Sequence, residues 1–337
     1  MIFAQGVRVP QTAKPPTNLA RPIPVLPETW VKKFLQLPAD RPFTSSEARA
    51  LGVNYVDLRR FVEHGLLIHP IRGAYVPAVL PDDLELRVKV LKLVVPSDCV
   101  VTDRTAGWLW GANMILAPGD HLKVPRVSVF CPPGLRLRNG LTDSGERQFA
   151  PGDVMELDGL LVTSPLRTAC DLGRLLHRDQ ALAALDSLTA LGSFTLDQLL
   201  EATLRFKGYR GVVQFRTLVL VVDPRAESPG ESILRLRWLD AGLPRPDCQV
   251  GVERPWGEPY AIDIGLPELR FGSEYDGEEF HGPERAEHDE QRREWLRTER
   301  GWMIEVASKR DVFGPTADIH ASLRRGYDEA LRTLSVR

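Results

Sequence analysis

The spacing of apolar residues predicts a small helical unit over residues 28–80. Apolar side chains recur every three to four positions from Trp30 to Leu35, which is typical of one buried face of a helix. A second short helix is expected next, because Ser45 or Ser46 can cap its first turn and a glycine follows it.

A third helix and a hairpin complete this unit. Asn54 can cap the helix, Asp57 stands three residues later as in a capping box, and Gly65 ends it. The segment LLIHPIRGAYVP then alternates between apolar and polar positions and turns near Arg72 and Gly73. Three helices followed by a hairpin predict a winged helix-turn-helix.

Residues 82–222 have a mixed rhythm that predicts an α+β domain. Ser164 before Pro165 marks a helix start by both an N-cap and an N1 proline. The predicted elements are helices over 84–95, 179–191 and 195–205 and strands over 124–130 and 159–163.

Residues 224–337 predict a separate α/β domain. Its order is a helix, three strands in a meander, a helix, a strand and a last helix, which makes a mixed sheet. The strands are expected over 249–254, 260–266, 270–276 and 302–307, and the later helices over 284–300 and 315–334. The fold class predicted for the whole chain is therefore multi-domain α/β.

Composition narrows the class of protein. Residues 1–27 hold six prolines and little apolar periodicity, which predicts a disordered tail without a signal peptide. The longest apolar run, at 217–222, is too short to cross a bilayer. The four cysteines lie far apart without a C-x-x-C pair, so we expect reduced thiols in a cytoplasmic protein with no membrane contact.

The charges are unevenly distributed along the chain. The net charge of −2 excludes a protein that binds nucleic acid by bulk basic charge. Residues 28–80 carry seven basic and five acidic side chains, whereas residues 228–310 carry twelve and eighteen. The acidic region is therefore either a solvated face or a site for a cation.

Four carboxylates in the acidic region are the candidate site. Asp263 stands between Ile262 and Ile264 on a predicted strand, where alternation would turn it to the opposite face. Glu274 and Asp276 share a face of the next strand, which antiparallel pairing can place beside Asp263. Such a cluster would bind Mg²⁺ or Mn²⁺, and a cation held there can activate water against a phosphodiester.

Each candidate also has an ordinary structural explanation. Glu231 lies three residues after Ser228 at a helix start, so it can be a capping-box glutamate. Asp263 can be a buried hydrogen-bond acceptor, and Asp276 before a glycine is typical of a turn. His281 and His288 can be surface residues.

Three segments of the C-terminal domain resemble the Vsr-like (very-short-patch-repair) endonucleases of the PD-(D/E)XK fold, especially a branch common in actinobacteria. The segments are SPGESILRLRWLDAGLPRPDCQV, AIDIGLPELRFGSEYDGEEFHG and DEQRREWLRTERGWMI. The resemblance implies an endonuclease fold over about 110 residues and a Mg²⁺-dependent deoxyribonuclease activity.

Residue by residue, the resemblance assigns catalytic roles to Glu231, Asp263, Glu274 and His281, with the cation on Asp263, Glu274 and Asp276. Gln249, Asp289 and Arg292 also match the pattern of this branch. One position departs from the wider fold, because Asp276 stands where its lysine would fall. That departure weakens the expectation of activity.

The N-terminal region and the segment DGLLVTSPLRTACDL resemble the AbiEi-like antitoxins of type IV toxin–antitoxin systems, over roughly residues 28–200. This resemblance implies a winged helix whose third helix would present Tyr55, Arg59 and Arg60 to double-stranded DNA, with Arg72 on the wing reaching a phosphate or the minor groove. The alternative for these side chains is a solvated helix face.

Two hypotheses follow for the whole chain. The first is a DNA-binding protein whose C-terminal domain hydrolyses phosphodiester bonds with Mg²⁺, with a toxin or defence-system protein as a further partner. The second is a non-enzymatic, antitoxin-like transcriptional regulator with a degenerate nuclease domain. The sequence leaves the oligomeric state and the DNA target open.

Overall fold

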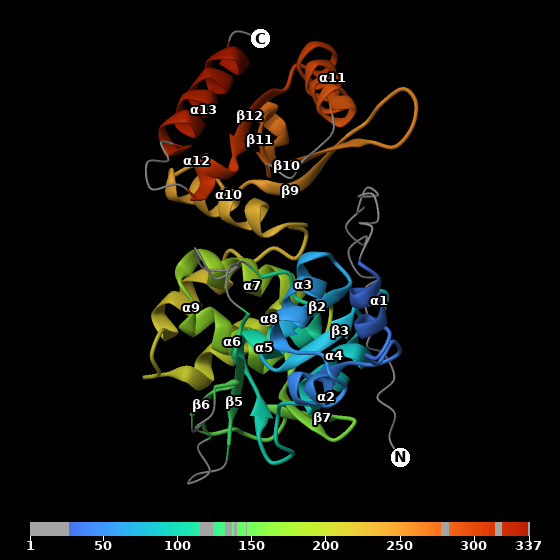
Figure 1. Cartoon of the computed structure of the whole chain (residues 1–337). Coiled ribbons are helices and arrows are strands. Elements are labelled where there is room, and N and C mark those ends of the chain that lie inside the picture. The colour runs from blue at the N-terminus through green and yellow to red at the C-terminus, as the bar shows by residue number, and fades with distance from the viewer. Residues whose placement is uncertain are drawn as a thin grey trace. The chain divides into compact units, whose positions relative to one another are not determined.

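The computed structural model describes residues 27–114, 124–131, 137, 140–145, 147–277, 283–313 and 319–335. It is a multi-domain α/β structure with mixed sheets, which confirms the predicted fold class (Figure 1). The predicted tail lies outside the described residues, except for Pro27.

The contacts divide the chain into two compact units. Unit 1 comprises residues 1–112, 116–172 and 191–207, and unit 2 comprises 113–115, 173–190 and 208–337. Residues 173–190 and 208–222, which the sequence assigned to the middle domain, therefore group with the C-terminal elements. The three-domain division at 80–82 and 222–224 stays a prediction.

Unit 1 begins with the expected three helices and hairpin. Its first sheet has the order β1-β3-β2 with antiparallel pairs. The elements are α1 (Glu28–Phe34), β1 (Phe43–Thr44), α2 (Ser45–Ala50), α3 (Tyr55–Glu63), β2 (Leu67–Ile71) and β3 (Ala74–Pro77).

Local chemistry accounts for the ends of these helices. Asn54 and Asp57 form the predicted capping box of α3. The predicted cap of α2 is wrong by one or two residues, because the side chain of Thr44 accepts the Glu47 amide instead. Gly73 has a φ of +90° at the predicted wing turn, a backbone conformation that favours glycine.

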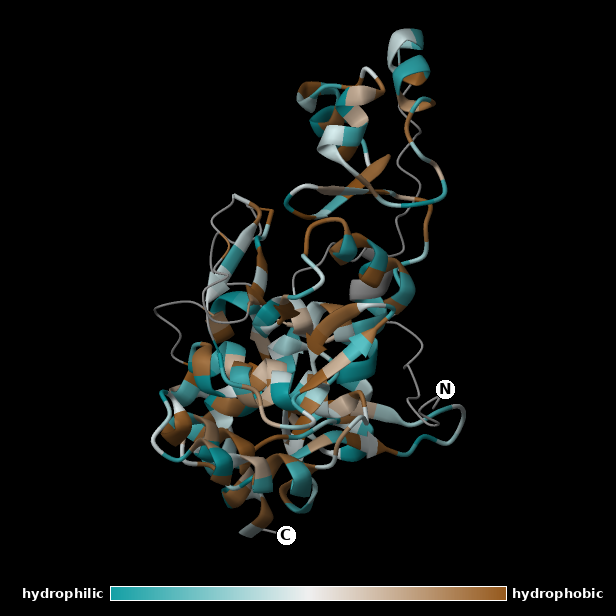
Figure 2. Cartoon of the chain, turned by 90° about the horizontal axis from the view of Figure 1, so that it is seen from below, coloured by the Kyte–Doolittle hydropathy of each residue, from teal (hydrophilic) through white to brown (hydrophobic). Residues whose placement is uncertain are grey.

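Unit 1 continues with a five-stranded sheet of order β6-β5-β4-β8-β7. The prediction located two of these strands and missed three short ones. The elements are α4 (Leu84–Lys92), β4 (Val100–Val101), α5 (Asp103–Trp110), β5 (Val127–Phe130), β6 (Thr142–Gly145), β7 (Val154–Leu157), β8 (Leu160–Thr163), α6 (Pro165–Leu175), α8 (Leu196–Ala202) and the 3₁₀ turn η2 (Thr203–Phe206). In Figure 2, polar and apolar residues alternate along helices and strands, as expected where each element buries one face.

A buried ionic network lies within unit 1. Both Asp153 and Asp171 accept hydrogen bonds from the Arg167 guanidinium, and all three side chains are at most 5% exposed. Arg147 joins Asp171 to Asp103, and Arg205 binds Asp153 from the other side. Burial alone would lower the pKa of Arg167, but the two aspartates raise it above its usual value.

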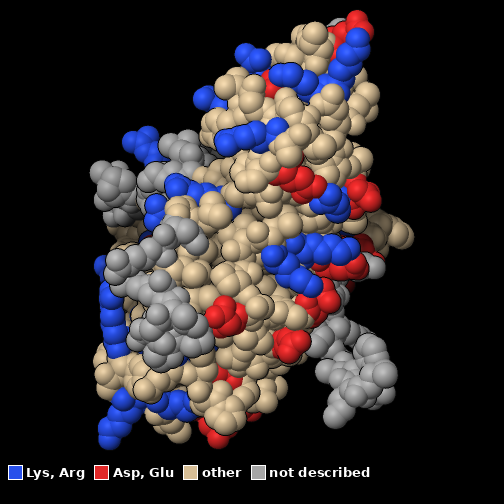
Figure 3. All heavy atoms as spheres, turned by 60° about the horizontal axis from the view of Figure 1, so that its bottom comes forward, with Lys and Arg blue, Asp and Glu red and all other residues tan. Residues whose placement is uncertain are grey.

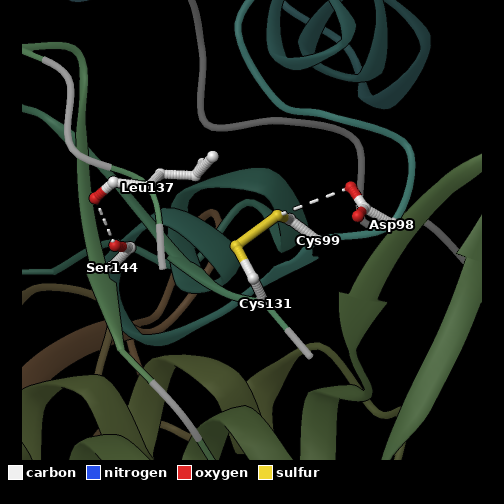
Figure 4. The surroundings of a disulfide bond; sticks show 5 residues. All are labelled: Asp98, Cys99, Cys131, Leu137 and Ser144. Atoms are coloured by element: carbon white, nitrogen blue, oxygen red, sulfur yellow. Dashed lines mark hydrogen bonds between the residues drawn. A yellow bond between two sulfur atoms is a disulfide. The ribbon is translucent and has the colours of Figure 1, made fainter. Parts of the chain in front are cut away.

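The expectation of four reduced thiols is wrong for two cysteines. Cys99 and Cys131 form a disulfide with a Cα–Cα distance of 4.4 Å (Figure 4). They are 32 positions apart in the chain, but β4 pairs antiparallel with β5 through Val100 and Phe130, so the two cysteines take the next facing positions. Cys170 and Cys248 are free and buried.

Unit 2 is built around a mixed sheet of order β12-β11-β10-β9, in which only the β11–β12 pair is parallel. The last helix, predicted over 315–334, is α13, and the short helix α12 before it was not predicted. The elements are α7 (Arg178–Ala190), α9 (Val212–Val219), α10 (Pro229–Asp240), β9 (Asp247–Val252), β10 (Tyr260–Leu266), the 3₁₀ turn η3 (Pro267–Leu269), β11 (Phe271–Asp276), α11 (Pro283–Arg300), β12 (Met303–Ser308), α12 (Lys309–Phe313) and α13 (Ile319–Ser335).

A second buried ion pair joins α7 to α10 within unit 2. The Arg235 guanidinium donates to Asp186, and both side chains are at most 3% exposed. The other oxygen of Asp186 accepts the backbone amide of Asp223. The segment before α10 is therefore fixed to the core of this unit.

None of the described helices combines the length and the apolar character that a membrane crossing needs.

Candidate functional site

Strands β10 and β11 bring two of the predicted carboxylates together. Their antiparallel register ends with the pair Ile264–Ser273, and Asp263 and Glu274 are the next residues along the two strands. Asp263 Oδ2 accepts the backbone amide of Tyr275 at 2.7 Å. The antiparallel pairing thus puts both side chains in one neighbourhood, as the sequence predicted.

Glu231 approaches from the first turn of α10. Ser228 caps this helix by accepting the Glu231 amide at 3.2 Å. The Glu231 carboxylate does not close a capping box, because its Oε2 accepts the Glu227 amide and the Gln249 side-chain amide, each at 2.9 Å. Hydrogen bonds from the helix start and from β9 therefore orient it.

The strands change face at the level of the site. Cys248 and Ile264 pack with α10 and α13 in one apolar cluster, whereas Val250 and Ile262 pack with Leu296 of α11 in another. The expectation that neighbouring isoleucines share a face is therefore wrong.

A backbone irregularity accompanies the change of face in β9. Gln249, which lies between Cys248 and Val250, has a φ of +52°, a value that residues with a side chain rarely adopt. Strained backbone of this kind is common where a side chain must be aimed at a site. Here the Gln249 amide is aimed at Glu231.

Glu274 is held by two arginines of α11. Arg292 donates to both of its oxygens at 2.8 and 2.7 Å, and Arg293 donates to Oε2 at 3.1 Å. Glu274 is only 3% exposed, so the pairing compensates its burial. Arg293 also reaches Asp276, whose side chain is 45% exposed.

The carboxylates without an arginine partner have perturbed acidity. Burial, reinforced by the charge of Glu231, raises the pKa of Asp263 to about 7. Burial also raises the pKa of Glu231 above its usual value. Both carboxyl groups therefore stay protonated to a higher pH than ordinary surface carboxyl groups do.

The residues fit a cation only in part. Among the described residues, no three His, Cys, Asp or Glu side chains form a group that could hold a metal ion. The predicted set of Asp263, Glu274 and Asp276 is not assembled as a triad, because the arginines engage its second and third members. Mg²⁺ needs only one or two carboxylate ligands and completes its shell with water. Asp263 and Glu274 can supply these carboxylates once Arg292 and Arg293 release Glu274.

The other residues that were predicted for this site are His281, Asp289 and Arg292. His281 is outside the described residues. Asp289, the first member of the D-x-x-R pair, lies 4.0 Å from the His288 ring, while Arg292 turns to Glu274. The sequence did not predict that Arg293 also binds Glu274. Adjacent helix positions point about 100° apart, and the motif included only Arg292.

The predicted DNA face of α3 is solvent-exposed in part. Tyr55 is 65% exposed, and Arg59 is exposed in an ion pair with Glu63 one turn later. The Arg60 guanidinium instead lies over the Trp30 ring, 4.9 Å from its centroid. Figure 3 shows one face of the molecule, on which basic and acidic side chains are interspersed.

Arg72 lies against the rest of unit 1. Its guanidinium donates to the carbonyl oxygens of Val124, at 3.2 Å, and Gly140, at 3.5 Å, and its amide donates to Pro125 O at 3.0 Å. A phosphate contact by Arg72 stays a prediction that would need these side-chain bonds to break.

Comparison with known families gives two matches. Residues 39–78 match a family model described as "Transcriptional regulator, AbiEi antitoxin". Residues 99–220 match a second one described as "AbiEi antitoxin C-terminal domain". The AbiEi-like part of the resemblance is confirmed.

Two curated proteins of Mycobacterium tuberculosis are similar over most of the chain. "Uncharacterized protein Rv2248" of strain H37Rv is 30% identical over 271 residues, which are 80% of this chain and 95% of that protein. "Uncharacterized protein MT2308" of strain CDC 1551 gives the same values.

Proposed function

This chain belongs to the family of the Mycobacterium tuberculosis protein Rv2248, and from that membership and its AbiEi-type segments we propose that it is a DNA-binding transcriptional regulator of the antitoxin type. The winged helix over residues 28–77 docks the duplex, and a toxin-type protein is its further partner. The exposed N-terminal half of α3 carries this proposal.

The geometry of α3 supports the DNA-binding role. Its first turn projects Tyr55 and Val56, which are 65% and 53% exposed, and Arg59 follows on the solvent side. Exposed aromatic, apolar and basic side chains at the start of a recognition helix suit base edges and phosphates in a major groove. At the wing turn, the Arg72 amide donates to Pro125 O and Gly73 O accepts the Ser45 amide.

Duplex affinity across a salt series tests this role. Each phosphate contact contributes about 0.9 to the slope of log K against log salt, so Arg59→Ala should lower that slope by about one. Lys89→Ala is a matched control, because Lys89 and Glu85 form a similar exposed pair on α4. Equal slopes for wild type and Arg59→Ala would remove α3 from the interface.

A second candidate function is Mg²⁺-dependent cleavage of DNA by the C-terminal site. The convergence of Glu231, Asp263 and Glu274 from one helix and two strands favours it. Asp263 and Glu274 would hold Mg²⁺ or Mn²⁺, and the bound cation would supply an acidified water and charge for the phosphate. Glu231, fixed by Gln249, would orient and accept protons from water at the site.

The non-enzymatic alternative also has a specific observation. Arg292 and Arg293 neutralise Glu274, which is what a degenerate site would retain for stability. Supercoiled plasmid incubated with Mn²⁺ separates the two. Nicking that disappears when chelator is added, and that is absent in Asp263→Asn, supports the nuclease. A plasmid that stays intact under all of these conditions supports the non-enzymatic regulator.

A further inference from the structure

The seam of the five-stranded sheet in unit 1 lies between β4 and β5. Strand β4 has only two residues, and its register with β5 comprises Val100 with Phe130 and Val101 with Val129. Because the sheet order is β6-β5-β4-β8-β7, this short pairing joins the β5–β6 half to the β4–β8–β7 half. The seam therefore depends on two residue pairs, as the β4–β8 pairing also does, together with the Thr102 amide that donates to Ser128 O.

The disulfide closes this seam covalently. Cys99 precedes β4 and Cys131 follows β5, so the bond adds one cross-link at the facing position next to the pairing (Figure 4). Both cysteines are buried, at 1% and 4% exposed. The Asp98 carboxylate lies 3.8 Å from Cys99 Sγ.

The wing of the winged helix is attached to the half of the sheet beyond this seam. The Arg72 amide donates to Pro125 O, and its side chain reaches Val124 O, just before β5. A Cβ at Gly73 would lie 3.1 Å from the Leu141 side chain, just before β6, so the turn packs closely there. The strands of the wing share their apolar core with the disulfide and with β5; the shared cluster includes Ile71, Ala74, Cys99, Val127, Val129 and Cys131.

We infer that the Cys99–Cys131 pair is a redox switch that fixes the wing for DNA binding when oxidised and loosens it when reduced. Two thiols lose two protons and two electrons to a low-molecular-weight disulfide, which leaves as two thiols, and the S–S bond forms. The reverse reaction consumes a dithiol reductant. Reduction leaves the seam to its short backbone pairing, so β5 and the attached wing turn open more often.

This inference rests on the proposed DNA-binding function, but its first readout does not. The full chain is prepared with glutathione disulfide or with dithiothreitol, and alkylation followed by mass measurement counts the free thiols. Two are expected in the oxidised form, at Cys170 and Cys248, and four in the reduced form. Hydrogen exchange is then followed at the amides of β5 and of Arg72.

Reduction should speed exchange at β5 and at the Arg72 amide by roughly tenfold or more, while the amides of α3 stay within a factor of about two, since local opening is confined to one structural unit. Cys131→Ser should behave as the reduced protein in both buffers, and Cys170→Ser should respond as wild type does. Equal exchange in the two forms, with the change of two thiols verified, would overturn the switch.

Duplex affinity provides the second readout. Oxidised protein should bind duplex DNA severalfold more tightly than reduced protein, and the difference should vanish in Cys131→Ser. If neither form binds DNA while exchange at Arg72 still responds, the proposed function fails and the coupling of disulfide to wing survives. If both forms bind equally and exchange does not respond, only the switch fails. Four free thiols in the glutathione disulfide buffer would also reject it.

Discussion

Two groups of buried charge in this protein are compensated in opposite ways. In unit 1, three aspartates and three arginines alternate, and the most buried members, Asp153, Arg167 and Asp171, bind one another directly. In unit 2, Glu274 has two arginines, whereas Asp263 and Glu231 accept hydrogen bonds from neutral amides, and burial and the charge of Glu231 raise the pKa of Asp263.

The difference distinguishes a structural network from a candidate site. A buried carboxylate that is fully matched by arginine is stabilised as an ion and has little to gain from another cation. One that is buried beside a like charge keeps a raised pKa and gains most when a cation or a proton arrives. A functional site is therefore indicated by buried negative charge that no arginine compensates, more than by the number of carboxylates.

The largest expected effect comes from breaking the matched network. Arg167→Met would leave Asp153 and Asp171, both at most 2% exposed, short of a partner, and should lower the stability of unit 1 by about 3–5 kcal/mol. Urea unfolding measures the loss. Arg205→Met is the control, because its side chain is 42% exposed and should cost about 1 kcal/mol or less. Similar losses in both variants would contradict the distinction.

The second effect concerns the mismatched site and depends on pH. The pKa of Asp263 is raised from 3.8 to about 7, so its favourable contribution is complete below about pH 4 and is lost as the pH rises through 7. Asp263→Asn keeps an acceptor for the Tyr275 amide, but it cannot ionise. The variant therefore does not lose stability as the pH rises through 7.

The variant should therefore match wild type near pH 4 and exceed its stability near pH 8 by on the order of 3 kcal/mol. Chemical unfolding of both proteins across this range measures the difference, with Asp276→Asn on the neighbouring strand as the control. An Asp263→Asn protein that is less stable than wild type at high pH would identify Asp263 as an ordinary structural acceptor.

A third effect tests whether Glu274 belongs with the matched or the mismatched group. Arg292→Met removes a bidentate partner from a carboxylate that is 3% exposed, which should cost about 1–3 kcal/mol. Arg297→Met, which breaks an exposed pair with Glu294, should stay within about 0.5 kcal/mol. Thermal unfolding of unit 2 compares them, and a neutral Arg292→Met would show that Arg293 alone suffices.

The smallest expected effect is stabilisation by a divalent cation. At tenfold excess over its Kd, Mn²⁺ should stabilise the folded wild type by about 1.4 kcal/mol, or a few degrees in Tm. Asp263→Asn should lose this response, and Asp276→Asn should keep it. Melting curves with Mn²⁺ and with chelator measure it. A response that survives Asp263→Asn would place the cation elsewhere.

The sequence predicted elements with strong local signals and missed those set by distant pairing. The Asn54–Asp57 capping box and the 260–266 strand were found because adjacent residues encode them. The two-residue strand β4 was missed because it is too short to show a period. Its pairing with β5 also hid the Cys99–Cys131 contact, since facing positions depend on register.

The candidate site was predicted in position and only partly in composition. Spacing placed Asp263 beside Glu274, because antiparallel neighbours follow from a tight meander. The arginines on Glu274 could not be assigned, since they depend on how α11 packs across the sheet. The change of face at Gln249 was hidden because a left-handed glutamine has no sequence signature.

The Asp186–Arg235 pair limits how this protein can exchange parts during evolution. Its two members stand 49 positions apart, one within the stretch that matches the antitoxin family and one beyond it. A recombination event between them would deliver one buried charge without its partner to the new gene. Productive junctions must therefore lie before Asp186 or after Arg235, so α7 and the first part of α10 are inherited together although the antitoxin match ends between them.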